Sequence, residues 1–107
     1  MSDTFRRIVE LVRGGNIQVS VHGYDEMAAD GILAGEAIEG AVVATVVEDY
    51  PDYFKGPCTL VLQRDRGGNP IHVVWGIPRE QTSPAVLVTA YRPDPMRWTD
   101  DFLRRKS

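Results

Sequence analysis

The feature that most constrains the fold is a set of three short runs rich in β-branched and aromatic residues in the second half of the chain. They span residues 58–64, 70–77 and 85–91, and this composition favours strands. Residues 65–69, Asp-Arg-Gly-Gly-Asn, are typical of a hairpin loop between the first two runs. Strands joined by short connections pair antiparallel. The second half therefore predicts an antiparallel meander.

The first half favours helices. Apolar residues recur at helical spacing over 2–13 and 32–46, and a shorter helix is expected over 24–30. A short alternating run at 17–21 predicts a further strand, and residues 98–105 are expected to form a short C-terminal helix. Helices followed by strands predict an α+β fold, with N-terminal helices packed on one face of a small antiparallel sheet of three to four strands.

Length and composition fit one ordinary soluble domain. The 107 residues suit a single domain spanning 1–107, and 43% apolar with 25% charged residues is close to the globular average. No run approaches the roughly 18 apolar residues that a membrane span needs, so we expect no membrane partner. The N-terminus does not resemble a signal peptide, and a single cysteine excludes an intrachain disulfide. Both features favour a cytoplasmic location.

The charges are unevenly distributed along the chain. The sequence has 15 acidic and 12 basic residues, for a net charge of −3, and residues 14–53 contain eight acids and no base. An acidic side and a basic side are expected if the two halves segregate in space. The net acidity argues against strong nonspecific binding of nucleic acid, which usually accompanies a basic domain.

The two histidines, His22 and His72, are the main candidates for function. His22 lies between a predicted strand and a turn, a common place for functional side chains. Glu26, four residues later, could orient the imidazole or act as a base. Alternation along 70–77 places Trp75 toward the core and turns His72 toward solvent or a cleft. The alternative for each histidine is a structural role, hydrogen-bonded or exposed.

Several short motifs occur in one order between about residues 17 and 98. They are Ser20-Val-His22, Met27, Gly31-Ile32, Val47-Glu-Asp-Tyr-Pro51, His72-Val-Val74, and Thr89-Ala-Tyr-Arg-Pro-Asp-Pro95 with Trp98. As an ordered set they resemble a bacterial family called domain of unknown function 4258. The resemblance implies a small α+β fold related to the barnase and RelE-type ribonucleases, a group that includes toxins of toxin–antitoxin systems. Relatives often carry arginine, suited to phosphate, where this chain has Glu26.

Metal-independent RNA cleavage needs a base for the ribose 2′-OH, an acid for the leaving oxygen, and a cation or donors for the charged phosphorane. Histidine suits acid–base work because its pKa lies near neutrality. The predicted catalytic residues are His22, His72 and Tyr91, and the predicted substrate-binding residues are Arg92, Thr89 and Glu26. Whether Tyr91 lies near His72 depends on strand register. Lys55 and Arg64 are further candidate cations.

Two functions remain open. The first is a metal-independent, ribonuclease-like toxin that acts on RNA and has a cognate antitoxin as partner. The second is a non-catalytic protein–protein interaction or regulatory module, favoured by the net acidity and by Glu26. A metal set of both histidines with Asp49 or Asp52 is conceivable, but no close ligand spacing occurs. We therefore expect neither a metal nor another cofactor.

Overall fold

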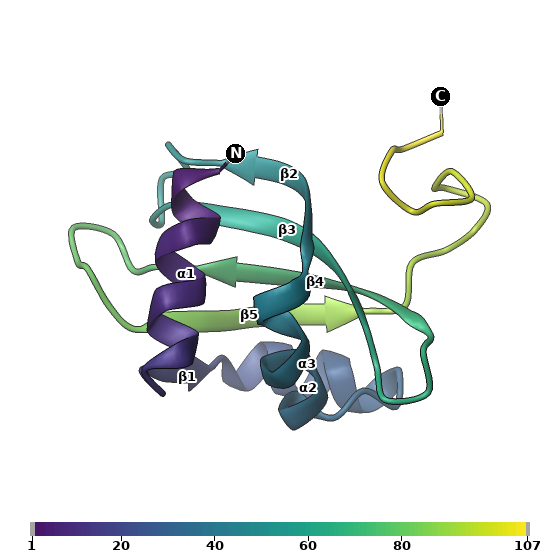
Figure 1. The fold of residues 1–107 in the computed structure, drawn as a ribbon, viewed down its shortest axis with the longest axis horizontal. Helices are drawn as coiled ribbons and strands as arrows, with labels where there is room; N and C mark the ends of the chain where they lie inside the picture. The colour runs from purple at the N-terminus through teal and green to yellow at the C-terminus, as the bar shows by residue number, and fades with distance from the viewer. Residues whose placement is uncertain (1, 107) are drawn as a thin grey trace.

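The computed structural model describes residues 2–106 and contains a five-stranded sheet with α1 and α3 crossing one face (Figure 1). The elements are α1 (Asp3–Arg13), β1 (Ile17–Val19), α2 (Val21–Ala29), α3 (Ala34–Gly40), a 3₁₀ turn (Ala41–Val43), β2 (Thr45–Tyr50), β3 (Cys58–Arg64), β4 (Pro70–Gly76) and β5 (Ala85–Tyr91). The predicted α+β class is confirmed.

The sheet is larger than expected and is mixed. Its order is β1-β5-β4-β3-β2, with β1 parallel to β5 and the other pairs antiparallel. The expectation of three to four antiparallel strands was therefore wrong at both edges of the sheet: β1 is parallel to its neighbour, and β2 is an additional strand. The helix predicted over 32–46 ends at Gly40, and β2 begins at Thr45. β-Branched residues fill 45–47, and pairing with β3 overrides the helical spacing there.

The predicted C-terminal helix is wrong. Residues 98–105 form turns closed by an isolated bridge between Trp98 and Arg105. The Asp101 carboxylate accepts a hydrogen bond from the Leu103 backbone N–H, and the Thr99 hydroxyl accepts one from the Arg104 N–H. Such local side-chain bonds compete with a helical backbone. The segment, yellow in Figure 1, follows the end of β5.

One hydrophobic core fills the space between the helices and the sheet. Trp75 is fully buried there, as the strand alternation predicted. Its indole N–H donates to the Gln63 side-chain oxygen at 3.0 Å, and the Gln63 amide donates to the Ala37 carbonyl at 2.7 Å. These buried polar groups are hydrogen-bonded to one another, which offsets the cost of their desolvation and links β4, β3 and α3.

Helix α2 lies against β5 with little space between the two backbones. The Ser20 hydroxyl accepts a hydrogen bond from the Gly23 N–H, so the helix begins at Val21, earlier than expected. The Ser20 N–H donates to the Leu87 carbonyl. A Cβ atom on Gly23 would lie 1.9 Å from the Val88 carbonyl oxygen. Only glycine permits this close approach.

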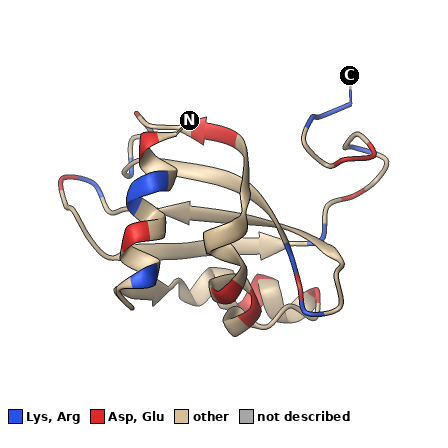
Figure 2. Ribbon diagram, in the orientation of Figure 1, with Lys and Arg blue, Asp and Glu red and all other residues tan. Residues whose placement is uncertain are grey.

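The two differently charged halves meet in space instead of forming separate sides. Figure 2 shows acidic positions on α2, α3 and β2, whereas α1 carries both signs. Two ion pairs cross between the halves, Arg66 with Glu39 and Arg105 with Glu48. Each pair neutralises an acid of the base-free stretch. None of the helices within residues 2–106 is long and apolar enough to cross a membrane.

Replacing Gly23 by alanine tests the contact of α2 with β5. The added methyl group must push the two backbones apart, so we expect a loss of about 1–3 kcal/mol in the free energy of unfolding, measured by urea denaturation. Gly35→Ala is the matched control, because a Cβ there meets nothing within 4 Å. That variant should be neutral or stabilised by up to about 1 kcal/mol. Equal effects of the two substitutions would contradict the proposed contact.

Candidate functional site

His72 lies on the sheet face opposite the main core and is fully buried. In the sheet it pairs with Leu62 of β3 on one side and Tyr91 of β5 on the other. The predicted face is therefore confirmed, and the register brings Tyr91 beside it. The expectation that His72 faces solvent or an open cleft was wrong, because the C-terminal segment, residues 92–106, covers the imidazole.

Two hydrogen bonds define the state of His72. Its Nε2 lies 2.8 Å from the Phe102 carbonyl oxygen, and its Nδ1 lies 3.3 Å from the Tyr91 hydroxyl. A carbonyl can only accept, so Nε2 carries the proton. In a neutral imidazole the other nitrogen is then an acceptor. Tyr91 therefore donates its hydroxyl proton to Nδ1.

The C-terminal segment is held over His72 by aromatic and ionic contacts. The Trp98 ring meets the imidazole edge-on, with 4.4 Å between ring centroids. The Arg105 guanidinium lies 4.7 Å from the centroid of the Trp98 ring and donates to both oxygens of Glu48 at 2.9 and 3.0 Å. Phe102 has a φ of 60°, uncommon for a residue with a side chain. This unfavourable backbone conformation occurs at the residue whose carbonyl reaches His72.

Burial keeps both members of the His72–Tyr91 pair neutral. Desolvation lowers the pKa of His72, although the hydrogen bond to Phe102 and the charge of Glu48 act in the opposite direction. Desolvation also raises the pKa of Tyr91; there Arg105 opposes the shift and Glu48 adds to it. Near neutral pH the pair is therefore a phenol donating to a neutral imidazole.

A polar pocket of about 320 Å³ opens beside Tyr91. Its lining comprises Tyr91, Arg92, Asp94, Arg97, Trp98 and Arg105. Arg92 is engaged in structure, because its backbone N–H and side chain bond Asp30 and its guanidinium pairs with Asp65 at 3.0 Å. The Arg97 side chain is 83% exposed and lies 3.9 Å from Asp94. Three arginines, one aspartate and two aromatic residues thus line a space of small-molecule size.

His22 lies elsewhere, on the first turn of α2. Its side chain is 86% exposed, and its Nε2 lies 3.5 Å from a carboxylate oxygen of Glu26. The predicted contact with Glu26 is present. Within residues 2–106, no hydrogen bond or ring contact joins His22 to His72, and His22 does not line the arginine pocket. A catalytic role for His22 stays a prediction.

The remaining predicted site residues occupy different surroundings. Arg92 lines the pocket, whereas Glu26 contacts His22 on α2. Thr89 pairs with Val74 on the same sheet face as His72, and its buried hydroxyl has no hydrogen-bond partner among the residues described. Substrate binding by Thr89 and Glu26 is therefore a prediction without a geometric link to the pocket. Across the described chain, no group of three or more His, Cys, Asp and Glu side chains could hold a metal ion.

The sequence model of a family described as "Domain of unknown function (DUF4258)" matches residues 19–92. The chain belongs to this family. The match includes both histidines and Tyr91, and it ends at Arg92, so the C-terminal segment lies beyond it except for its first residue. Comparison with curated proteins and with solved structures returned no match. The likeness to barnase and RelE-type ribonucleases therefore remains a resemblance.

Sequence reasoning missed much of the site of this DUF4258 domain. Arg97 and Arg105 line the pocket, Glu48 fixes Arg105, and the Phe102 carbonyl sets the histidine tautomer. The C-terminal arginines carried a signal in their charge and in their closeness to Trp98. The Phe102 carbonyl carried none, since any residue type supplies that acceptor.

The lowered pKa of His72 makes stability depend on pH. The folded pKa lies below the unfolded value of about 6.5. The unfolded chain therefore binds the extra proton in this interval. The contribution is complete above pH 6.5 and is lost as pH falls through the folded pKa. Urea unfolding of the wild type between pH 7.5 and 5 should show this loss, and His72→Gln should lack it.

His22→Ala is the control for this titration, because it removes the other, exposed histidine and leaves His72 in place. Carboxylates titrate in the same acidic range, so the comparison uses the difference between each variant and the wild type. An identical pH dependence in the wild type and His72→Gln would contradict burial of a neutral His72.

Proposed function

We propose that this DUF4258 domain is a metal-independent ribonuclease that uses the Tyr91–His72 pair. The observation that carries the proposal is Tyr91, which lines an arginine-rich pocket and whose hydroxyl is hydrogen-bonded to a buried neutral histidine. Acid–base groups beside several cations are what phosphodiester cleavage requires. The resemblance to a group containing ribonucleases points to the same chemistry.

The pair can remove a proton from a ribose 2′-OH by a relay of two coupled proton transfers. The 2′-OH gives its proton to the Tyr91 oxygen while Tyr91 gives its own proton to Nδ1 of His72. Tyr91 stays neutral, His72 becomes an imidazolium, and the 2′ oxygen forms a bond to phosphorus as the bond to the 5′ oxygen breaks. The 5′ oxygen takes a proton from water, and the hydroxide that forms is neutralised when the imidazolium returns its extra proton through Tyr91. The Phe102 carbonyl supports this relay, since it accepts from Nε2 and stabilises the imidazolium.

The arginines divide into a fixed and an adaptable set. Arg92 and Arg105 are tied to carboxylates, so their positive charges are partly balanced. Arg97 is exposed, and within residues 2–106 its guanidinium makes one ion-pair contact, with Asp94 at 3.9 Å. We assign Arg97 to the scissile phosphate, because its guanidinium can turn toward an anion without breaking a strong pair.

The biological role that fits this activity is that of a toxin whose activity a partner protein restrains. The resemblance alone supports this role. His22, with Glu26 beside it, and Thr89 are secondary positions in the proposal: His22 assists protonation of the leaving group by water, and Thr89 and Glu26 contact the substrate. The same cleavage assay that tests Tyr91 tests these positions separately.

RNA cleavage by purified variants tests the catalytic pair. Tyr91→Phe removes only the relaying hydroxyl, so we expect kcat/KM to fall about 10²- to 10⁴-fold on a fluorescent oligoribonucleotide. Tyr24→Phe is the matched control, because Tyr24 is exposed on α2 and lies outside the pocket. His22→Ala, measured in parallel, should reduce the rate less than Tyr91→Phe. Equal activity of the wild type and Tyr91→Phe would overturn the proposal.

Absence of cleavage in the wild type, together with no salt-sensitive RNA binding, would favour the non-catalytic interaction module instead. Arg97→Gln should weaken RNA binding and reduce its salt dependence, since it removes one phosphate contact. Arg104→Gln is the comparison, because Arg104 carries the same charge on the same segment but does not line the pocket.

The pH profile gives a further expectation. His72 must be neutral to accept a proton, and burial lowers its pKa. The acid limb of kcat/KM should therefore lie below pH 6.5, the ordinary value for histidine. The residual activity of His72→Gln should lack this limb. A limb at or above pH 6.5 would show that a different group, such as an exposed histidine, acts as the base.

A further inference from the structure

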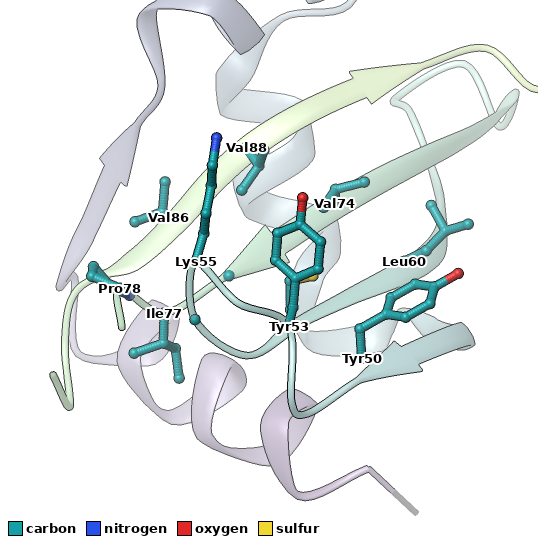
Figure 3. A pocket seen from close by; sticks show the side chains of 12 residues that line it. Tyr50, Tyr53, Lys55, Leu60, Val74, Ile77, Pro78, Val86 and Val88 are labelled. Atoms are coloured by element: carbon teal, nitrogen blue, oxygen red, sulfur yellow. The ribbon is translucent and has the colours of Figure 1, made fainter. Parts of the chain in front are cut away.

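A second pocket lies on the same sheet face as His72, displaced along the strands from the arginine pocket, and has a volume of about 460 Å³. Its floor is made of Leu60, Val74, Val86 and Val88 from three neighbouring strands (Figure 3). The C-terminal segment does not contribute to its lining. This half of the face is therefore an open apolar surface.

The loop between β2 and β3 forms the wall of this pocket. Tyr53 and Lys55 project from the loop over the apolar floor, and Tyr50 stands beside them at the end of β2 (Figure 3). Gly56 turns this loop with a φ of 124°, and its backbone lies close to the Ile77 carbonyl. The Arg79 N–H donates to the Lys55 carbonyl at 3.1 Å, which fixes the base of the lysine.

Lys55 is the one cationic residue in this lining. Its ammonium lies 5.7 Å from the centroid of the Phe54 ring. No carboxylate within residues 2–106 lies within 4.0 Å of it, whereas Glu48, near Tyr50, is already paired with Arg105. An unpaired positive charge thus stands at the rim of an otherwise apolar pocket.

We propose that this pocket binds a small apolar molecule with a single anionic group, such as a medium-chain carboxylate. The apolar chain would lie on the valine and leucine floor, and the carboxylate would pair with Lys55. The volume falls in the range of about 300–1,000 Å³ typical of small-molecule sites, which are apolar with a few placed polar groups. The proposal is independent of the ribonuclease activity.

Pocket size and charge favour this occupant over a protein. A stable protein partner usually covers about 800 Å² on each side. The loop that carries Tyr53 and Lys55 bounds this pocket on one side and so limits the apolar surface that a protein partner could cover. A single unpaired cation at the rim fits one anionic head group. An exposed pair of this kind changes affinity by about two- to fivefold. The ion pair should therefore change the affinity only modestly, and burial of the apolar chain should supply most of the binding free energy.

Octanoate and octylamine provide matched probes, because they share a chain and carry opposite charges at pH 7. Both are titrated into the full-length protein, and methyl chemical shifts of Val74, Val86 and Val88 are followed by NMR. Octanoate should shift these methyl groups and bind two- to fivefold more tightly than octylamine. Lys55→Gln should remove the preference, and Lys55→Glu should reverse it. Lys106→Glu, at the only other lysine, should leave the preference unchanged.

Three results would overturn the proposal. The first is equal binding of both probes by the wild type. The second is a charge preference that survives in Lys55→Glu. The third is self-association of the free protein in sedimentation experiments that perturbs the same valine methyl groups, which would assign the face to a second copy. Lys55 is on the pocket rim, so its variants should fold. Lys55, a candidate phosphate cation from the sequence alone, lines this pocket and not the one beside Tyr91. Cleavage of RNA by these variants should therefore match the wild type, which separates this test from that of the catalytic pair.

Discussion

The hydrogen bond from His72 Nε2 to the Phe102 carbonyl links a central strand to an irregular segment 30 residues later. Leaving a buried imidazole without this partner would cost about 1–3 kcal/mol. The bond also fixes the tautomer, so Nδ1 faces Tyr91 as an acceptor. Because the same segment carries Trp98, Arg97 and Arg105, the bond positions the walls of the arginine pocket. His72 therefore orients the Tyr91 hydroxyl and also holds in place the segment that lines the proposed site.

The two faces of the sheet are covered differently. One face packs against α1 and α3 and holds the core around Trp75. The C-terminal segment covers the part of the other face around His72. Farther along the strands, the part around Val88 stays open as an apolar pocket. Helix α2 lies along β5, where Gly23 permits close contact. Two separate pockets thus lie on one face of the sheet.

The fold was predictable where local patterns agree with tertiary pairing. The runs at 58–64, 70–77 and 85–91 became strands, and alternation placed Trp75 and His72 on opposite faces. Residues 45 and 46 were assigned to a helix because the apolar spacing before them is helical, whereas pairing with β3 makes 45–50 a strand. The C-terminal segment was expected to form a helix, but Thr99 and Asp101 accept hydrogen bonds from the local backbone and hold it in turns instead.

The candidate site was only partly predictable for a similar reason. His72, Tyr91 and Arg92 were found from residue type and resemblance, and their closeness depended on the register that the structure supplies. Burial of His72 could not be foreseen, because the residues that cover it form no regular element. His22 was expected to act together with His72. The side chain that hydrogen-bonds His72 is instead that of Tyr91, and His22 contacts Glu26. Chemically reactive residue types can be read from a sequence; which of them meet depends on the fold.

Long-range ¹H–¹⁵N NMR spectra of the histidine side chains at pH 7 test the central claim most directly. Burial of a neutral His72 with a protonated Nε2 and an accepting Nδ1 predicts one protonated and one unprotonated ring nitrogen, with the Nδ1 signal shifting in Tyr91→Phe. The exposed His22 serves as the internal reference. A protonated Nδ1, or an imidazolium at pH 7, would contradict the proposed pair.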